Sequence, residues 1–548
     1  MDIQNKNTDW LRLVFIIFVA AYASLFLIGP FLGPTDDFYF LRTLQVGKPM
    51  LPYSQSFPYF NFLSRGRFAP LGAMEYNLPA FFSASAFSYF LYHSIQFILL
   101  AVMLIFLISR VTSKKLLIYG IPILLFLTPE FTISFFRMQM TERIIIILFA
   151  LLLLCYSLYL EKRKIWYLLV GFIAANLVIY FKEPIFVVIG VFAVSYLFLS
   201  RKIADKKIKI FNGLLLLSSL AYAVIYYFHV YLHLGPVLYS SNPYNPLLVF
   251  IKNFLNYGFF SDPILILILL PMTAWRIYKI FIRRQESHPF YDSCLITASA
   301  YVLMFFALNM YGLHYLLPAY VLAIPALIYF LVQKKEKMPF IKTAGFIAGF
   351  ILIFNTLPSG IHYLTYYKYL PVNFNKTLAF LIQDIDSRHP NERVNIFLDG
   401  IDRGTGRDTY FILSEFLQFK GLSNLKFNLK SDIETKNASP LALIKPGNPT
   451  PPFTVFETDK TDKIASGDYL VISPQTPKNI NKPYLQSLNK DYELVFQTKS
   501  PLAFPNLNLK TLAKYFLSRK ISQSQKEKGV MTNENLMQWP DYYVLIRK

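Results

Sequence analysis

Long apolar runs separated by short polar connections fill the first two thirds of the chain. A transmembrane helix needs roughly 20 mostly apolar residues, and several runs reach that length. The candidate spans lie near residues 11–32, 87–109, 115–129, 143–160, 165–181, 184–200, 210–233, 262–282, 292–310, 313–332 and 340–358. The pattern therefore predicts an α-helical polytopic membrane protein with about 11 transmembrane helices over residues 1–358. The first run continues past the small residues at 21–23, which favours a retained span over a cleaved signal peptide.

The pattern changes after about residue 375, where apolar residues gather in short clusters typical of strands. The clusters lie at 394–398, 453–456, 469–472, 493–496 and 542–546, and segments 376–389 and 408–420 have a helical pattern. Residues 375–548 are therefore expected to form a C-terminal α/β soluble domain. Within it, the glycine-containing segment 403–407 sits between a strand and a helix, an order that also cradles phosphates. A plain turn is the preferred interpretation, and an anion contact is the alternative.

Composition supports a membrane location. Of the 548 residues, 55% are hydrophobic and only 16% are charged, which is too apolar for a water-soluble protein of this length. A formal net charge of +22 would suggest a nucleic-acid partner in a soluble protein. Here many of the basic residues lie in short connections between spans, so we expect contact with membrane lipid and no nucleic acid. The two cysteines, Cys155 and Cys294, lie inside apolar runs and give neither a disulfide framework nor a cysteine metal site.

The distribution of Lys and Arg predicts the orientation of the spans. One set of alternate connections carries well over twice as many basic residues as the other set, and it includes the N-terminus. Basic connections stay in the cytoplasm. We therefore expect the cytoplasmic (inner) membrane, a cytoplasmic N-terminus and, after an odd number of spans, an extracytoplasmic C-terminal domain. The outer connections are then residues 33–86, 130–142 and 234–261.

The segment after the first span carries the most informative polar residues. Asp36 and Asp37 are adjacent carboxylates at a membrane exit, and an aromatic-rich turn follows them. Such a pair suits a general base or a metal ligand. The alternative is helix capping, with Thr35 or Asp36 as the N-cap and Asp37 in the first turn. Capping does not exclude catalysis.

Other ionisable residues on the outer side are few, and they supply the candidate phosphate contacts. The cations are Arg65, Arg67, Arg137 and Lys182. Arginine can contact phosphate oxygens in a bidentate fashion and stays charged. Anchoring to anionic lipid headgroups is the alternative for Arg65 and Arg67. A divalent metal ion is a further possibility, held by Asp36 and Glu142 together with Asp37 if their loops converge.

These residues resemble the GT-C superfamily of polytopic glycosyltransferases, which includes protein O-mannosyltransferases and lipid A aminoarabinose transferases. Asp36 and Asp37, with Gly47-Lys48-Pro49 after them, match the acidic pair, aromatics and Gly-x-Pro of the first outer loop. The resemblance implies a sugar donor linked to polyprenyl phosphate and an aspartate that acts as base on the acceptor hydroxyl. It also implies an acceptor or metal role for Glu142.

Two further segments carry the resemblance more loosely. Lys182-Glu183-Pro184 is similar to a lysine-containing turn of related enzymes, and Glu183 is placed with Glu142 as an acceptor or metal contact. His314 begins a segment that resembles the Arg-Tyr-x-x-Pro contact to the donor phosphate. A histidine here replaces the family's arginine, and a neutral histidine would bind phosphate less well.

The expected function is transfer of a sugar from a polyprenyl-phosphate carrier to a lipid, glycan or protein acceptor at the outer face of the membrane. A single base with direct attack would invert the anomeric configuration. Two alternatives remain: a transporter or flippase of a lipid-linked glycan, and a glycan polymerase or ligase. The C-terminal domain is expected to have an accessory role, either binding the acceptor or covering the mouth of the active site.

Overall fold

A computed structural model covers the whole chain. The residues that it describes are 2–34, 37, 40–41, 43–50, 68–201, 205–233, 246–259, 261–308, 312–333, 341–399, 406–423, 425–431, 464–474, 488–518 and 537–548.

The first part of the chain is a bundle of helices. Its members are α1 (Asp2–Leu27), α4 (Asn77–Phe82), α5 (Ala86–Ser109), α6 (Lys115–Phe126), α7 (Pro129–Phe136), α8 (Glu142–Lys162), α9 (Ile165–Phe181), α10 (Ile185–Leu199), α11 (Lys206–His229), α12 (Pro246–Asn253), α13 (Leu270–Phe281), α14 (Pro289–Ala307), α15 (Leu317–Ile328), α16 (Ile341–Ile351) and α17 (Leu357–Arg388). Short 3-10 turns lie at Leu44–Val46, Met74–Tyr76, Tyr231–His233 and Leu313–Leu316. π-helical segments lie at Phe254–Phe259, Leu265–Leu269, Tyr329–Gln333 and Leu352–Thr356.

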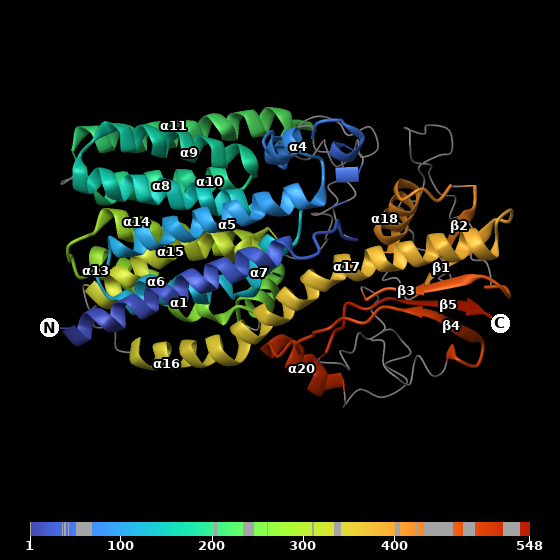
Figure 1. Cartoon of the computed structure of the whole chain (residues 1–548). Helices are drawn as coiled ribbons and strands as arrows, with labels where there is room; N and C mark the ends of the chain where they lie inside the picture. Colours follow the sequence, from blue (N-terminus) through green and yellow to red (C-terminus); the bar gives the residue numbers. More distant parts are fainter. Residues whose placement is uncertain are drawn as a thin grey trace.

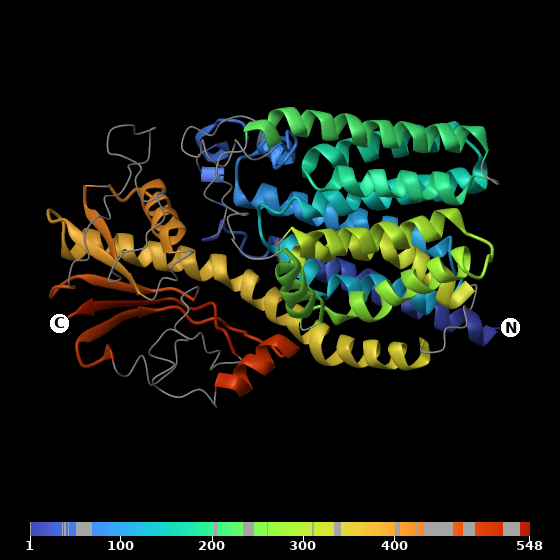
Figure 2. The same cartoon turned by 180° about the vertical axis from the view of Figure 1, so that it is seen from behind.

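The two chain ends lie at opposite ends of the molecule (Figure 1). The N-terminus lies at the free end of the bundle, whereas the C-terminal domain lies beyond the other end, which we call the domain end. The view from behind shows the same arrangement, with α4 near the domain end (Figure 2). The connections after α5 and α8 lie at the free end, where Arg110 pairs with Glu161 and Arg163 pairs with Asp205. The expected orientation of the spans stays a prediction.

The helices confirm the expected helical membrane architecture. Among the described residues, seven helices are long and apolar enough to cross a membrane, or eight if the bent pair α6 and α7 counts as one. The expected spans at 165–181, 184–200 and 262–282 also form helices, but these are shorter. Many of the exposed side chains on the bundle are large and apolar, including Leu217, Leu220 and Val224 of α11. Such a surface needs a lipid environment.

The outer connection expected at 130–142 is wrong in one respect, because its first half is the buried helix α7. α6 and α7 are bent by 61° at the break between them. Thr128 caps α7 by accepting the Phe131 N–H, and Pro129 occupies the first turn, where its missing N–H costs nothing. All eight residues of α7 are buried. Glu130 therefore lies inside the protein rather than on an outer surface.

α17 joins the bundle to the C-terminal domain without a break. Its 32 residues begin where the last expected span ends and continue through residues 359–374, the interval expected between the two regions. Pro371 lies inside this helix, where it removes one backbone donor. Figure 1 shows α17 leaving the bundle and running along the C-terminal domain.

The C-terminal domain contains a five-stranded sheet in the order β2-β1-β3-β5-β4. Its strands are β1 (Val394–Asp399), β2 (Phe427–Ser431), β3 (Tyr469–Ile472), β4 (Tyr492–Gln497) and β5 (Tyr543–Arg547), with α18 (Gly406–Phe419) and α20 (Leu509–Ser518) beside them. β1 is parallel to β2 and β3, whereas β5 is antiparallel to β3 and β4. The α/β domain is confirmed. The expected strand at 453–456 and residues 403–405 of the glycine-containing segment lie outside the described residues.

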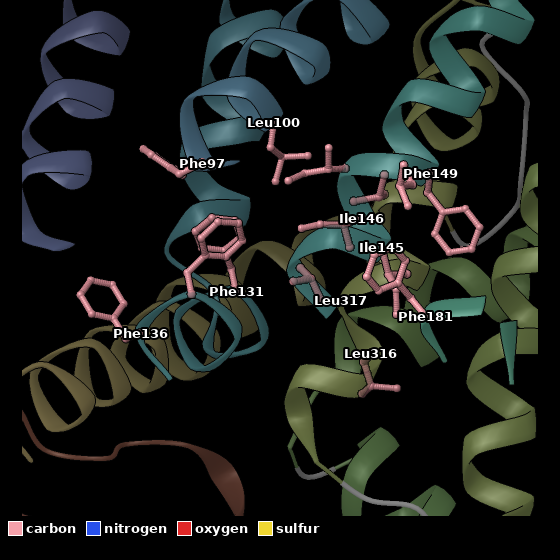
Figure 3. Close-up of a cluster of buried hydrophobic side chains, with 14 of the residues drawn as sticks. Phe97, Leu100, Phe131, Phe136, Ile145, Ile146, Phe149, Phe181, Leu316 and Leu317 are labelled. Atoms are coloured by element: carbon pink, nitrogen blue, oxygen red, sulfur yellow. The ribbon is translucent and has the colours of Figure 1, made fainter. Parts of the chain in front are cut away.

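A cluster of buried apolar side chains fills the bundle near its domain end (Figure 3). It brings together Ile145 and Ile146 of α8, Phe181 at the end of α9, and Leu316 and Leu317 at the start of α15. Each of these residues is within three positions of an ionisable residue at the domain end. Close packing of these apolar side chains fixes the backbone that carries the neighbouring ionisable residues.

Candidate functional site

Asp37 follows the end of the first helix and is buried at the domain end of the bundle. Its side chain is 3% exposed. The Gly33 N–H donates to Asp37 Oδ2 at 2.6 Å, so the carboxylate closes a tight turn on the chain just before it. The carboxylate accepts a hydrogen bond from a backbone N–H, as it would in the helix capping considered as its alternative role. Such a contact does not exclude catalysis. Asp36, its expected partner, lies outside the described residues.

Arg143 is a buried cation that interacts electrostatically with the Asp37 carboxylate. Its guanidinium is fully buried and lies in the electrostatic field of both Asp37 and Glu75. It donates to the carbonyls of Ser134 at 2.7 Å and Met138 at 2.7 Å. These carbonyls belong to the end of α7 and the turn after it, where a helix leaves acceptors unpaired and favours positive charge. Arg143 therefore holds this turn beside the first loop.

Glu75 supplies a second carboxylate that interacts electrostatically with Arg143. Both of its carboxylate oxygens are buried, and among the described residues neither has a hydrogen-bond partner. Burial raises the pKa of Glu75 to about 7, and the positive charge of Arg143 opposes that rise. Glu75 is therefore a group that can change its protonation near neutral pH. Tyr76, next in the chain, lies against the guanidinium of Arg143, with 5.5 Å from Cζ to the ring centroid.

Glu142 and Lys182 form a buried ion pair at the same end. The ammonium of Lys182 binds Glu142 Oε1, and the two side chains are only 6% and 2% exposed. Lys182 Nζ also lies 3.9 Å from the centroid of the Tyr315 ring, a cation–π contact. His314, adjacent to Tyr315, lies in the field of Glu142 and Lys182. The structure thus brings together three expected site residues from α8, from the turn after α9 and from the turn before α15.

The remaining expected residues lie at the edge of this group or outside the described residues. Arg137 is half-buried and contributes to the electrostatic field at His314, and its Cζ lies 5.8 Å from the centroid of the Tyr367 ring on α17. Glu183 is half-buried beside Lys182. Arg65 and Arg67 lie outside the described residues, so their expected phosphate contacts stay predictions.

The described residues contain no group of three His, Cys, Asp or Glu side chains arranged to hold a metal ion. Glu142, one expected ligand, is instead occupied by Lys182. Asp36, the other expected ligand, belongs to the part of the chain that the structure leaves undescribed.

Neither Glu75 nor Arg143 was assigned a role from the sequence. Arg143 lies next to Glu142 at the start of an apolar helix, where a charged residue is costly unless it is paired. Glu75 stands alone among apolar and aromatic residues of the first loop. Those contexts were the available signals. Their convergence could not be found from sequence, because the two residues are far apart in the chain and interact only in the folded protein.

Comparison with known proteins gives weak likenesses. No protein-family model matches the chain, and no curated protein does. The solved structures that are similar to it include ArnT from Cupriavidus metallidurans bound to undecaprenyl phosphate, with 13% identity over 89% of this chain and 96% of that chain and a TM-score of 0.42. They also include the Archaeoglobus fulgidus oligosaccharyltransferase tethered with an acceptor peptide, with 14% identity over 98% of this chain and 88% of that chain and a TM-score of 0.39. With TM-scores below 0.5, neither likeness carries an argument for this chain.

Proposed function

We propose that this protein is a membrane glycosyltransferase. It moves a sugar from a polyprenyl-phosphate carrier to an acceptor at the outer face of the cytoplasmic membrane, with the N-terminus in the cytoplasm. The observation that carries the proposal is the convergence of ionisable residues at the domain end. Asp37, Glu75 and Arg143 interact there across three separate segments of a bundle with an apolar surface. Buried charges within a membrane protein are costly, and they mark functional sites.

The position of this group suits a lipid-linked substrate. A polyprenyl chain stays in the bilayer while its phosphate lies at the surface, so donor and acceptor meet where helices end and loops begin. Asp37 lies in the segment that follows α1, and its contact with the Gly33 N–H fixes the carboxylate. A fixed carboxylate can accept the proton of an acceptor hydroxyl as the reaction proceeds.

The chemistry is a single displacement. The acceptor oxygen forms a bond to the anomeric carbon, and the bond from that carbon to the phosphate oxygen breaks. The acceptor proton passes to Asp36 or Asp37, and the polyprenyl phosphate leaves with the negative charge. Because no covalent intermediate forms on the protein, the product has the inverted anomeric configuration.

Cations at the domain end stabilise the leaving phosphate in this mechanism. Arg137 and Lys182 are the described candidates, joined by Arg65 and Arg67 from the first loop and by His314. The charge of Lys182 is shared with Glu142, so its contribution requires that this pair loosen or that Glu142 also contact the acceptor. We assign Glu142 and Glu183 to acceptor contact on this basis.

The proposal is tested in a deletion strain by mass spectrometry of cell-envelope glycolipids and glycoproteins. We expect the deletion strain to lose one sugar mass and the wild-type chain to restore it. At least one of the variants Asp36→Asn and Asp37→Asn should fail to restore it. Asp386→Asn is the matched control. Asp386 is a half-exposed carboxylate that pairs with Lys426, and it lies at the far end of α17 from the site. Retained anomeric configuration in the product would refute the mechanism.

The same experiment distinguishes the alternatives. A flippase would leave the unmodified lipid-linked sugar on the cytoplasmic side of the deletion strain, and both aspartate variants would restore the product. A polymerase or ligase would instead change glycan chain length or attachment without loss of a single sugar.

A further inference from the structure

Helix α17 contacts the exit of the first helix along one of its faces. Asn375 Nδ2 donates to the carbonyl of Leu32 at 2.8 Å. One turn earlier, the ring of Pro371 lies so close to Gly33 that a Cβ on this glycine would come within 3.1 Å of Pro371 Cγ. Gly33 is the residue whose N–H holds Asp37. The backbone that positions Asp37 is therefore held against α17.

The ammonium of Lys368 extends this contact to the end of α1. It donates to the carbonyls of Leu25 and Ile28, which a helix end leaves without intrahelical partners. Lys368, Pro371 and Asn375 are spaced by three and four residues, so they share one face of the helix. This face of α17 thus contacts the last turn of α1 and also Leu32 and Gly33, where the first loop begins.

A different face of α17 is held by the C-terminal domain. Asn373 is 1% exposed, and its Nδ2 lies within hydrogen-bond distance of Ser500 Oγ at 2.8 Å, the Pro540 carbonyl at 2.7 Å and Asp541 Oδ1 at 2.9 Å. Asp541 in turn accepts the backbone N–H and the hydroxyl of Ser500. Asn373 is therefore the centre of a closed network between two segments of the domain.

The contacts of α17 with the end of α1 and its contacts with the C-terminal domain lie on opposite sides of the helix. Residues 373 and 375 are separated by about 200° around the helix axis, since each residue turns it by about 100°. A folded helix of 32 residues cannot move one face without the other.

We propose that α17 transmits the position of the C-terminal domain to Asp37, with Asn373 and Asn375 as positioning residues. The mechanical link does not depend on the proposed function, whereas its meaning for sugar transfer rests on it. In this account the domain affects the catalytic aspartate through α17, besides any part that it takes in acceptor binding.

The link is tested by hydrogen–deuterium exchange of the full-length protein in lipid nanodiscs, followed by mass spectrometry. Asn375→Asp keeps the shape of the side chain but removes its donor, so exchange in peptides that contain Gly33 should rise about five-fold, the factor for one lost buried hydrogen bond. Asn373→Ala should raise exchange in the same peptides and also in those that contain Ser500. Ser500→Ala is a milder variant in case Asn373→Ala fails to fold.

Thr365→Val is the matched control, because Thr365 is a buried polar residue of α17 that donates to carbonyls of its own helix. It should leave exchange at Gly33 unchanged. The proposal is overturned if Asn373→Ala and Ser500→Ala loosen the peptides around Ser500 but not those around Gly33, or if Thr365→Val loosens Gly33 as much. A protein that shows this coupling but transfers no sugar would refute only the proposed function.

Discussion

Neutralising one member of the buried Lys182–Glu142 pair should destabilise the protein far more than neutralising both. Both side chains are almost fully shielded from solvent, so water cannot compensate a single charge left behind. Removal of one partner of such a pair typically costs about 3–5 kcal/mol, whereas replacement of both is often close to neutral. Lys182→Met should therefore be strongly destabilising, Glu142→Gln somewhat less so because an amide can still accept a hydrogen bond, and the double variant much closer to wild type.

Unfolding in mixed detergent micelles, measured for the four proteins of a double-mutant cycle, gives the coupling free energy directly. We expect a favourable coupling of at least about 2 kcal/mol between Lys182 and Glu142. The exposed pair Lys426–Asp386, whose side chains are 32% and 48% exposed, is the matched control and should show less than about 1 kcal/mol.

Additive single-variant effects would refute this reasoning, since they would mean that water or another group solvates each charge at the domain end. Transfer activity adds an independent result. A stable double variant without activity would show that Lys182 or Glu142 acts on substrate, and an active double variant would show that the pair is structural.

Three further predictions follow from buried groups. Because the folded protein keeps the Glu75 proton up to about pH 7 whereas the unfolded chain releases it near pH 4.5, the free energy of unfolding should fall as pH rises through this window, and Glu75→Gln should remove that slope in pH-dependent unfolding curves. Gly360→Ala should destabilise the protein by several kcal/mol, because its Cβ would overlap the Leu127 carbonyl; an unchanged melting temperature would contradict the close packing of α17 on the turn before α7. Glu130→Gln should raise the free energy of unfolding by about 1 kcal/mol in denaturation measurements. The carboxyl groups of Glu130 and Asp262 interact inside the protein, and the glutamine amide could donate a hydrogen bond to Asp262.

The sequence was sufficient to predict the long apolar helices but not all of their ends, and it did not predict the short helices α4, α7 and α12. Apolar runs mark the segments that need lipid or protein around them, and each predicted run contains a helix in the structure. The last run was expected to end near residue 358, where its apolar character fades. α17 nevertheless crosses residues 359–374 and continues through the helical segment expected at 376–389, because Asn373, Phe374 and their neighbours are buried against the C-terminal domain. Packing against a distant part of the chain left no signal in the interval 359–374.

The candidate site was only partly predictable for a similar reason. The ionisable residues of the outer side could be named one by one, because charges are rare in apolar sequence. Their pairing could not: Lys182 and Glu142 are 40 positions apart, and Arg143 reaches the first loop through the turn after α7. Nothing in a single sequence reports that α7 folds inward as a buried helix.

The unbroken course of α17 changes how the boundary between the two parts of the protein should be understood. A truncation that removes residues 375–548 would delete Asn375, Ser500 and Asp541 together, so it would remove the contacts of Asn373 with the domain and also the hydrogen bond from α17 to the Leu32 carbonyl. Loss of transfer in such a protein would then not show that the domain binds an acceptor. In evolutionary terms, the domain could be exchanged for another only with the helix that carries it, so the unit of inheritance should begin within the membrane, near the start of α17.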